Sequence, residues 1–240
     1  MKPCMKILKV PLILITILFC LSSHAAETGL LFCEEFKDLS NWEPLYFPKI
    51  KKHSSYAVIS EEGRSYLRAV SDASASAIIY RKTFNVYDYP RIRWRWKVDS
   101  VYTKAKGREK TGDDYPIRIY VMFQYDPQKA GFSERLMYAA SKALYGKYPP
   151  HSSLNYVWAS RENEAGIITS PYTDRSRMIV LEKGRNKVGQ WIDEKVDVLE
   201  DYRKAFGKSP PAIAGIAVMN DSDNTKERSV SYVEFIEVFK

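Results

Sequence analysis

The chain has 240 residues, of which 45% are hydrophobic and 13% aromatic, and this is enough to bury the core of one large domain. Its formal net charge is +8, from 37 Lys and Arg against 29 Asp and Glu, and it falls to +5 without the three lysines among the first nine residues. This mild excess does not indicate a nucleic-acid-binding protein, for which a denser basic patch and a matching motif are expected. It suits contact with anionic polymers or envelope surfaces.

The first 25 residues have the organisation of a secretory signal peptide. Lysines stand at positions 2, 6 and 9, a mostly apolar run extends from Val10 to Leu21, and Ser23 and Ala25 are small residues at a cleavage position. We predict that residues 1–25 are removed, which leaves a periplasmic or secreted domain with no transmembrane anchor. An uncleaved anchor is the alternative, but the apolar run is short for a membrane span. Of the three cysteines only Cys33 would remain, and we expect it to be a buried, unreactive thiol.

Short extended segments fill the first half of the mature chain. They are expected at residues 30–36, 42–47, 56–60, 65–70 and 75–84. The third and fourth flank Glu61-Glu62-Gly63-Arg64, a hairpin signature with glycine at the turn. Short strands at this spacing are typical of an all-β sandwich or barrel.

Residues 91–98, Arg-Ile-Arg-Trp-Arg-Trp-Lys-Val, alternate strictly between basic and apolar side chains. Period-two alternation marks a half-buried strand, and it places Trp94 and Trp96 on the dry side. After a polar loop at 100–115, residues 117–124 repeat the alternation. The two segments predict one sheet with a dry face and a basic, polar face.

Residues 131–146 break the strand pattern, because apolar side chains recur there at helical spacing. These are Phe132, Leu136, Ala139, Ala140, Ala143 and Leu144. We predict one inserted amphipathic helix at about 132–146 that packs its apolar side against the sandwich. Contact with a membrane surface or a protein partner is the alternative.

The second half returns to strands, expected at 153–160, 166–170, 177–183, 190–196, 213–219 and 230–239. Asp197 to Glu200 resembles a capping box that opens a short helix through Phe206, with Gly207 as its C-cap. The predicted fold is mainly β: a single jelly-roll-like antiparallel β-sandwich over residues 27–240, with one inserted amphipathic helix and one short helix.

An ordered series of motifs adds a family resemblance. The series runs through Trp94-x-Trp96, Gly112-Asp113-Asp114, Arg118-x-Tyr120-Val121, Leu154-Asn155-Tyr156-Val157-Trp158-Ala159, Gly215-Ile216-Ala217-Val218-Met219 and Asp221-Ser222-Asp223-Asn224-Thr225. With these motifs the chain resembles an uncharacterised family of secreted bacterial proteins, known as a domain of unknown function. The resemblance implies a jelly-roll fold similar to carbohydrate-binding modules, and it brings no established activity.

The polar sides of the predicted sheet supply the candidate ligand-binding residues. They are Arg93, Arg95, Arg118, Tyr120, Gln124 and, on a neighbouring strand, Asn155. Arginine forks suit planar carboxylates, and amides and hydroxyls suit sugar hydroxyls. A solvated face covered by the inserted helix is the competing interpretation.

Oxygen ligands for a metal are expected after the strand at 213–219. Asp221, Asp223 and Asn224 stand within four residues, and oxygen-rich loops of this kind suit hard cations such as Ca²⁺. No Gly and Glu follow at the spacing of a complete Ca²⁺ loop, so a polar turn is the competing interpretation.

Asp113 and Asp114 form a second acidic pair, just before the strand that carries Arg118. They could bind a metal, or one could be held protonated for acid catalysis. They could equally neutralise Arg93, Arg95 or Arg118, and we favour these ion pairs. Contact in space between this pair and the Asp221 loop would strengthen the metal interpretation.

These features favour a periplasmic or secreted binding protein for a glycan or another anionic, hydroxyl-rich ligand. A polysaccharide lyase or glycoside hydrolase that uses the same face is one alternative, and an envelope protein-interaction module is another. The sequence contains no Gly-x-Ser-x-Gly, no His-Glu-x-x-His and no phosphate loop, so catalytic residues are not assigned. The sequence does not indicate an oligomeric state.

Overall fold

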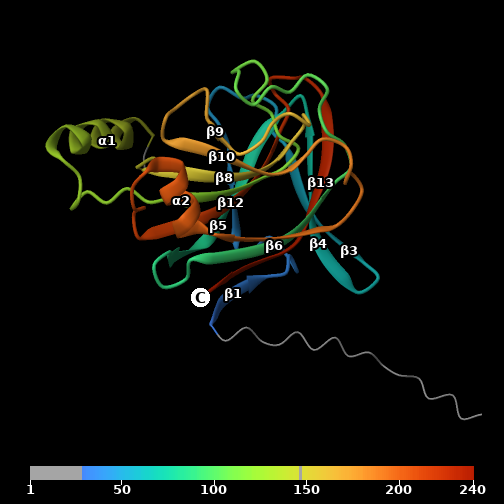
Figure 1. Ribbon diagram of the computed structural model, residues 1–240, viewed down its shortest axis with the longest axis horizontal. Coiled ribbons are helices and arrows are strands. Elements are labelled where there is room, and N and C mark those ends of the chain that lie inside the picture. The colour runs from blue at the N-terminus through green and yellow to red at the C-terminus, as the bar shows by residue number, and fades with distance from the viewer. Residues whose placement is uncertain (1–28, 146–147) are drawn as a thin grey trace, which may run out of the picture.

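A computed structural model describes residues 29–145 and 148–240 as a β-sandwich of two sheets with two helices (Figure 1). The predicted fold class is therefore confirmed. The expected leader, residues 1–25, lies outside the described residues, and the division into a leader and one domain stays a prediction. Neither described helix has the length and apolar composition needed to cross a membrane.

The first sheet, here called sheet A, has the strand order β11-β6-β13-β4-β3, and β1 also pairs with β13. The bounds are β11 (Ile192–Asp197), β6 (Arg91–Val98), β13 (Arg228–Phe239), β4 (Arg64–Asp72), β3 (Ser55–Glu61) and β1 (Leu30–Glu34). β13 pairs with β6 along one side, and with β4 and then β1 along the other. The β3–β4 hairpin turns at Glu62 and Gly63, both with positive φ, as the glycine signature predicts.

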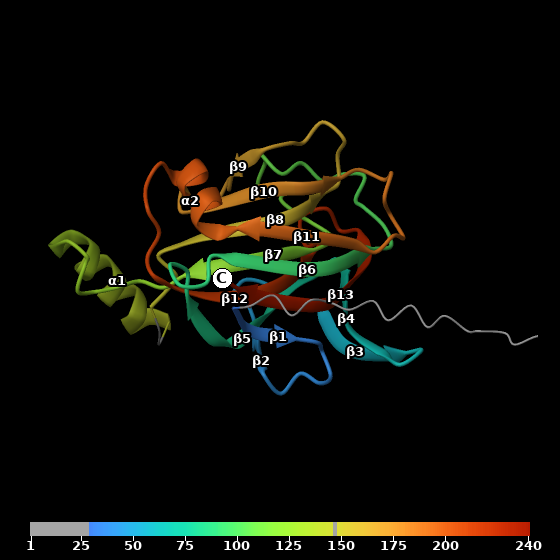
Figure 2. The same ribbon diagram turned by 60° about the horizontal axis from the view of Figure 1, so that its bottom comes forward.

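The second sheet, sheet B, has the order β2-β5-β12-β7-β8-β10-β9. The bounds are β2 (Trp42–Leu45), β5 (Ala75–Asn85), β12 (Ile213–Asp221), β7 (Arg118–Phe123), β8 (Ser152–Ala159), β10 (Ser176–Lys183) and β9 (Ile167–Thr169). All of these pairings are antiparallel except β8 with β10, which run parallel. Figure 2 shows the strands of both sheets stacked in layers.

Aromatic side chains from both sheets fill the space between them. Trp94 and Trp96 of β6 are fully buried and meet edge to face, with ring centroids 5.4 Å apart. Trp94 also contacts Tyr156 of β8, and Trp96 contacts Trp158 at 6.1 Å. Burying rings of this size is a strong driving force for closing the sandwich. The predicted core role of all three tryptophans is confirmed.

The expectation that the two alternating strands share one sheet is wrong. β6 belongs to sheet A and β7 to sheet B, because the chain crosses from one layer to the other through the loop after Val98. Period-two alternation records only which side of a strand is dry, and the two dry sides here face each other across the core. The polar sides therefore lie on opposite surfaces of the molecule.

The short helix α2 (Val198–Phe206) forms as predicted. The Asp197 carboxylate accepts a hydrogen bond from the Glu200 amide at 2.9 Å, and Gly207 closes the helix with φ 67°. Val198 and Tyr202 are buried against the sandwich.

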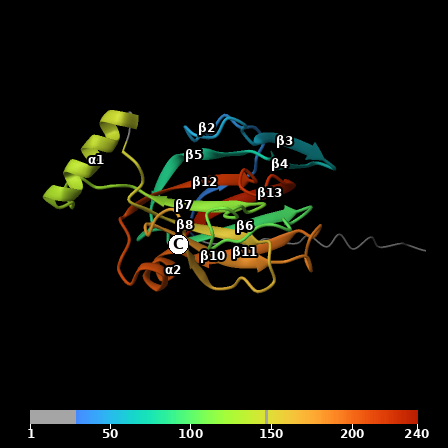
Figure 3. The same ribbon diagram turned by 90° about the horizontal axis from the view of Figure 1, so that it is seen from above.

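The inserted helix α1 (Phe132–Tyr145) also forms, but its predicted packing is wrong. It stands away from the sandwich in Figures 1 and 3, and Phe132 and Leu136 are 86% and 65% exposed. Among the α1 residues whose side chains the structure describes, Tyr138 alone is buried. Tyr138, through its ring and its hydroxyl, and the Glu134–Arg175 ion pair hold the helix where the periodicity predicted an apolar stripe.

The expected burial of Cys33 is also wrong, because this residue alternates along β1 with the buried Phe32 and Glu34 and so points to the exposed side of the strand. Partial burial of the sulfur, with Glu237 beside it, still raises the thiol pKa to about 12. The thiol therefore stays protonated at neutral pH.

Candidate functional site

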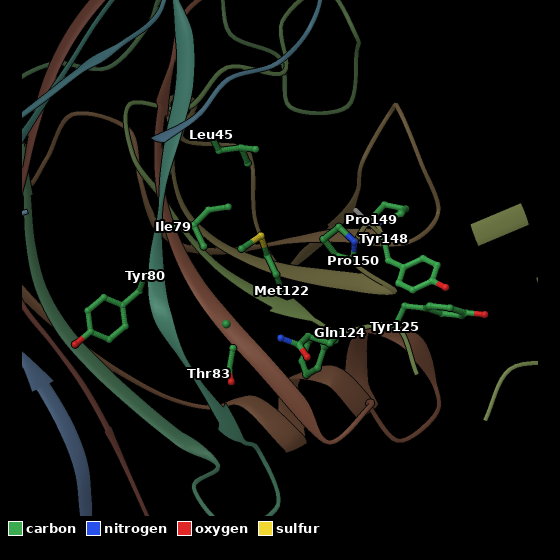
Figure 4. Close-up of a pocket in the computed structure, with 12 residues that line it drawn as sticks. Leu45, Ile79, Tyr80, Thr83, Met122, Gln124, Tyr125, Tyr148, Pro149 and Pro150 are labelled. Carbon is green, nitrogen blue, oxygen red and sulfur yellow. The ribbon is translucent and has the colours of Figure 1, made fainter. Parts of the chain in front are cut away.

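The outer face of sheet B carries a cavity of about 440 Å³, here called the tyrosine cavity (Figure 4). Its floor comes from four neighbouring strands: Leu45 of β2, Ile79 and Thr83 of β5, Gly215 of β12, and Met122 of β7. Gln124, just beyond β7, points into the same space in Figure 4. A volume of this size is within the range of small-molecule sites.

The floor is low because small residues lie at its centre. Gly215 has no side chain, and a Cβ placed there would meet only Thr83 at 3.8 Å. Its neighbour on the same face, Ala217, is small as well, whereas Met122 pairs with Gly215 across the strands and stands higher. The sequence of β12 thus determines the depth of the cavity.

An aromatic wall bounds one side. Tyr125 stacks face to face on Tyr138 of α1, with ring centroids 3.7 Å apart, and Tyr148 meets Tyr125 edge-on at 5.2 Å. Pro149 and Pro150 complete the wall. Rigid aromatic rings beside amide and hydroxyl groups offer a ligand both apolar surface to pack on and directional hydrogen-bond partners.

A second cavity of about 460 Å³, here called the serine cavity, lies on the other side of the same proline pair. Pro149 and Pro150 line both cavities. The polar side chains of the serine cavity are Tyr138, Ser141, Ser152, Ser153, Thr173, Arg175 and Ser176. Among the described residues that line this cavity, Arg175 is the one with a positive charge.

Asn155 lies beneath the serine cavity and is 1% exposed. Its Nδ2 donates to Ser176 Oγ at 2.7 Å, and Ser153 Oγ donates to the same oxygen at 3.1 Å. Asn155 therefore positions a lining hydroxyl, although its own side chain is covered.

Arg118 lies on the same face of sheet B but is enclosed, with 4% exposure. Its Nε donates to Asp221 Oδ1 at 2.9 Å, its Nη2 bonds Asp221 Oδ2, and Nη2 also donates to the Asp113 carbonyl at 2.6 Å. The Tyr115 ring covers the guanidinium at 4.5 Å. An arginine held in this way is not available to a ligand.

The two acidic stretches meet around Arg118, and we call Asp113, Asp114, Asp221 and Asp223 the carboxylate cluster. Asp113 Oδ1 lies 3.6 Å from Arg118 Nη1, which agrees with the favoured ion-pair interpretation. Asp114 accepts hydrogen bonds from the Asn224 and Thr225 amides and from Asn224 Nδ2. The cluster thus joins the loop before β7 to the loop after β12.

Burial dominates the proton affinity of the cluster. It raises the pKa of Asp113 to about 6, because Arg118 offsets only part of the desolvation and Asp114 adds repulsion. Burial also raises the pKa of Asp221 to about 7, in spite of the Arg118 fork. One guanidinium among these carboxylates leaves an excess of negative charge.

Carboxylate oxygens of Asp114, Asp221 and Asp223 lie within 4.8 Å of one another, so these three could hold a cation. Asp113 instead faces Arg118, and the side-chain amide of Asn224 donates a hydrogen bond to Asp114. The Asp113–Asp114 pair and the Asp221 loop are in contact, which strengthens the metal interpretation. However, Arg118 already bonds Asp221, so the Ca²⁺ assignment stays a prediction.

Tyr120 lies on β7 between Arg118, which the carboxylate cluster surrounds, and Met122 of the tyrosine cavity. Its hydroxyl donates to Met219 Sδ at 3.4 Å, and burial raises its pKa to about 12. Asn155 pairs with it across the strands. Of the six predicted ligand residues, Gln124 lines the tyrosine cavity, whereas Arg93 and Arg95 line a separate cavity of about 610 Å³ on sheet A.

Arg93 and Arg95 lie on the opposite surface of the molecule, on the outer face of sheet A. Arg95 forks onto Asp193 at 2.8 and 2.7 Å and reaches Glu234 at 3.3 Å. Arg93 pairs with Glu237, its cross-strand neighbour. The predicted single basic face is thus divided, because its members belong to different sheets.

Sequence reasoning missed the aromatic wall and Arg175. Tyr125, Tyr148 and the proline pair stand in segments without periodicity, and Arg175 stands in a turn before β10. Aromatic residues next to Pro149-Pro150 were the available signal. Their meeting across the end of β7 depends on the sheet order.

Solved structures with a similar fold include two carbohydrate-binding modules of Clostridium thermocellum. A family 11 module in complex with a β-1,3-1,4-mixed-linked tetrasaccharide is 8% identical, with 88% of this chain and 94% of that chain covered and a TM-score of 0.39. A family 30 module of the cellulosomal cellulase Cel9D-Cel44B is 11% identical, with 88% and 98% covered and a TM-score of 0.41.

The Trichoderma harzianum endoglucanase 3 of family GH12 is 8% identical, with 84% of this chain and 99% of that chain covered and a TM-score of 0.39. The likeness in all three is one of fold. The comparison with curated proteins gives no match.

A family profile matches residues 40–237, which include nearly every strand described above. The matched family is described as a protein of unknown function, DUF3047. The expected resemblance is therefore confirmed, and the chain belongs to this family.

Proposed function

We propose that this protein binds a glycan in the tyrosine cavity on the outer face of sheet B. The observation that carries the proposal is the lining of this cavity. It combines the rings of Tyr125 and Tyr148 with the amide of Gln124 and the hydroxyl of Thr83, and none of the described residues that line it is charged. A hydroxyl-rich, uncharged sugar unit suits such a lining.

The proposal changes the expected ligand chemistry. The predicted anionic ligand relied on Arg93, Arg95 and Arg118, and all three are occupied by carboxylates. Neutral sugar hydroxyls need directional donors and acceptors and a ring to pack on, which the tyrosine cavity supplies.

Binding is favoured over hydrolysis or elimination by the same geometry. A glycosidase needs two carboxylates across the scissile bond, and no Asp or Glu is among the described residues that line either cavity. A lyase base at Tyr120 would have to lose a proton that burial holds to a pKa of about 12.

We further infer that the protein acts in the periplasm or outside the cell, in keeping with the leader-like first 25 residues. Fractionation of producing cells, with N-terminal sequencing of the product, tests this. A cytoplasmic product that begins at residue 1 would contradict it.

Calorimetric titration with a panel of neutral oligosaccharides tests the binding proposal. Replacing Tyr148 by Ala should weaken binding about tenfold, since a ring in contact with a ligand contributes on the order of 1–2 kcal/mol. Gln124→Ala should cost about as much through the lost hydrogen bonds.

The matched control is Arg95→Gln on the outer face of sheet A, which does not belong to the described lining of the tyrosine cavity. It should leave the affinity unchanged. Equal losses in Arg95→Gln and Tyr148→Ala would contradict the assignment of the cavity, and no binding of any oligosaccharide would contradict the function itself.

A second candidate is a protein contact through α1, favoured by the exposure of Phe132, Leu136 and Met137 on a helix that projects from the sandwich. Two copies of one apolar helix face can pair about a twofold axis, so a second copy of this chain is the first partner to test. Light scattering over a range of concentrations should show a dimer that Leu136→Ser abolishes. A monomer at every concentration would contradict self-association.

A further inference from the structure

The serine cavity differs from the tyrosine cavity in charge. Its lining holds five serine and threonine hydroxyls, the Tyr138 hydroxyl and one guanidinium, that of Arg175, whereas the described lining of the tyrosine cavity carries no charge. The two cavities share Pro149 and Pro150 and therefore lie next to each other on the outer face of sheet B. One chain-like ligand lying across the proline pair would reach both.

Arg175 is held in place from one side. Its Nη1 donates to the Tyr138 hydroxyl at 2.5 Å, and the guanidinium lies 5.4 Å from the centre of the same ring. The Tyr138 hydroxyl in turn donates to the Pro150 carbonyl at 3.2 Å. The aromatic wall of the first cavity thus orients the cation of the second.

The other side of the guanidinium is unused. Among the described residues, no group accepts a hydrogen bond from Arg175 Nε or Nη2, and the side chain is 40% exposed. The nearest carboxylate, Glu134 on α1, lies 3.5 Å from Nη1 and is itself partly exposed. A pair of neighbouring N–H donors in one plane matches the two oxygens of a carboxylate.

The hydroxyls beside Arg175 are fixed as well. Ser176 Oγ accepts from both Asn155 and Ser153, so its own proton is directed away from these donors. Asn155 Oδ1 is buried without a hydrogen-bond partner among the described residues. A polar ligand in this cavity therefore meets groups that are already oriented.

We propose that the serine cavity binds the carboxylate of an acidic sugar unit, and that the ligand is a glycan with a neutral unit in the tyrosine cavity and a uronic acid next to it. This inference rests on the proposed function, which it deepens by naming the class of glycan. Arg175 supplies the fork, and Ser153, Thr173 and Ser176 face the ring hydroxyls.

Two matched probes test the proposal: a tetrasaccharide that contains a uronic acid, and the same compound with its carboxylates reduced to alcohols. The protein should bind the acidic probe about tenfold more tightly, since hydrogen bonds to charged groups are among the stronger ones. This preference should shrink as salt rises from 0.05 to 0.5 M, values chosen to bracket a Debye length of about 10 Å.

Arg175→Gln should lower the affinity for the acidic probe to that for the reduced one and leave the reduced probe unaffected. Arg175→Lys, which keeps the charge but not the fork, should retain only part of the preference. Arg95→Gln, the matched change on sheet A, should behave as the unaltered protein.

The two proposals fail in different ways. Equal affinity of the unaltered protein for both probes would overturn the carboxylate site while leaving glycan binding intact. No affinity for the reduced probe or any neutral oligosaccharide would overturn the proposed function. A preference for the acidic probe that persists in Arg175→Gln would place the carboxylate elsewhere.

Discussion

The outer faces of the two sheets differ in how their charged side chains are arranged. On sheet A, cations and anions alternate across neighbouring strands and neutralise one another, as Arg95 does with Asp193 and Glu234. On sheet B, the buried charges collect in the carboxylate cluster at one end of β7 and β12, and the tyrosine cavity, whose described lining is uncharged, lies toward the other end of these strands. A row of basic residues in a strand therefore says little about ligand binding until its cross-strand neighbours are known.

Burial accounts for the difference in energy between the two arrangements. Asp193 on sheet A is 58% exposed, whereas Asp221 on sheet B is 2% exposed in its side chain. Water screens the first pair and not the second. The following predictions test this contrast in order of expected effect.

Removal of Asp221 should have the largest effect. Asp221→Ala leaves the Arg118 guanidinium buried without its fork, and breaking a buried pair costs on the order of 3–5 kcal/mol of the free energy of unfolding. Urea denaturation measures the loss. Asp193→Ala on sheet A is the control and should cost no more than about 1 kcal/mol. Similar losses in both variants would remove the contrast between the faces.

The carboxylate cluster should also make stability depend on pH. The pKa of Asp113 is about 6 in the folded protein and lies near the ordinary aspartate value of 3.8 in the unfolded chain, so the folded state binds more protons between these values. Stability is therefore fully present below about pH 4 and falls as pH rises through 6, by on the order of 3 kcal/mol for this group.

Asp113→Asn should flatten that fall, which denaturation at a series of pH values from 4 to 7 will show. Asp221 and Glu194, whose pKa values burial raises to about 7, titrate in both proteins and mainly cancel in the difference. A variant as pH-dependent as the unaltered protein would show that Asp113 ionises normally.

Filling the tyrosine cavity should abolish glycan binding without harming the fold. Gly215→Val adds a side chain to the floor of the tyrosine cavity, where a Cβ meets only Thr83 at an ordinary 3.8 Å. Glycan affinity should fall at least tenfold, while thermal stability stays equal or rises slightly, because valine favours strands. Unchanged affinity would place the ligand outside this cavity.

Arg95→Ala tests the charge lattice of sheet A and should matter less. Its side chain is 35% exposed, so loss of its pairs with Asp193 and Glu234 should cost about 1 kcal/mol or less, and less still in high salt. Thermal unfolding at two salt concentrations measures this. A cost as large as that of Asp221→Ala would mean that both faces are organised alike.

Calcium should have the smallest effect. Arg118 already supplies a cation to Asp221, and Asp114 is bonded by Asn224 and Thr225, so we expect Ca²⁺ or a chelator to shift the unfolding temperature by less than about 2 °C. A larger shift that Asp223→Asn removes would instead support the cation site of Asp114, Asp221 and Asp223.

The sequence by itself determined what depends on near neighbours in the chain. Alternation in β6 fixed which side of that strand is dry, Glu62-Gly63 fixed a hairpin, and Asp197 with Gly207 fixed both ends of α2. Motifs were enough to identify the family and its sandwich fold. These features rest on backbone preferences and local periodicity, which act over a few residues.

The tertiary structure alone decided which polar sides meet. The crossing from β6 to β7 placed Arg95 and Arg118 on opposite surfaces, and the order of sheet B brought Asp113 to Asp221. The same strand order placed Gly215 beside Met122 and so formed the floor of the tyrosine cavity. Sheet order and cross-strand register join residues far apart in sequence, and side-chain periodicity carries no information about either.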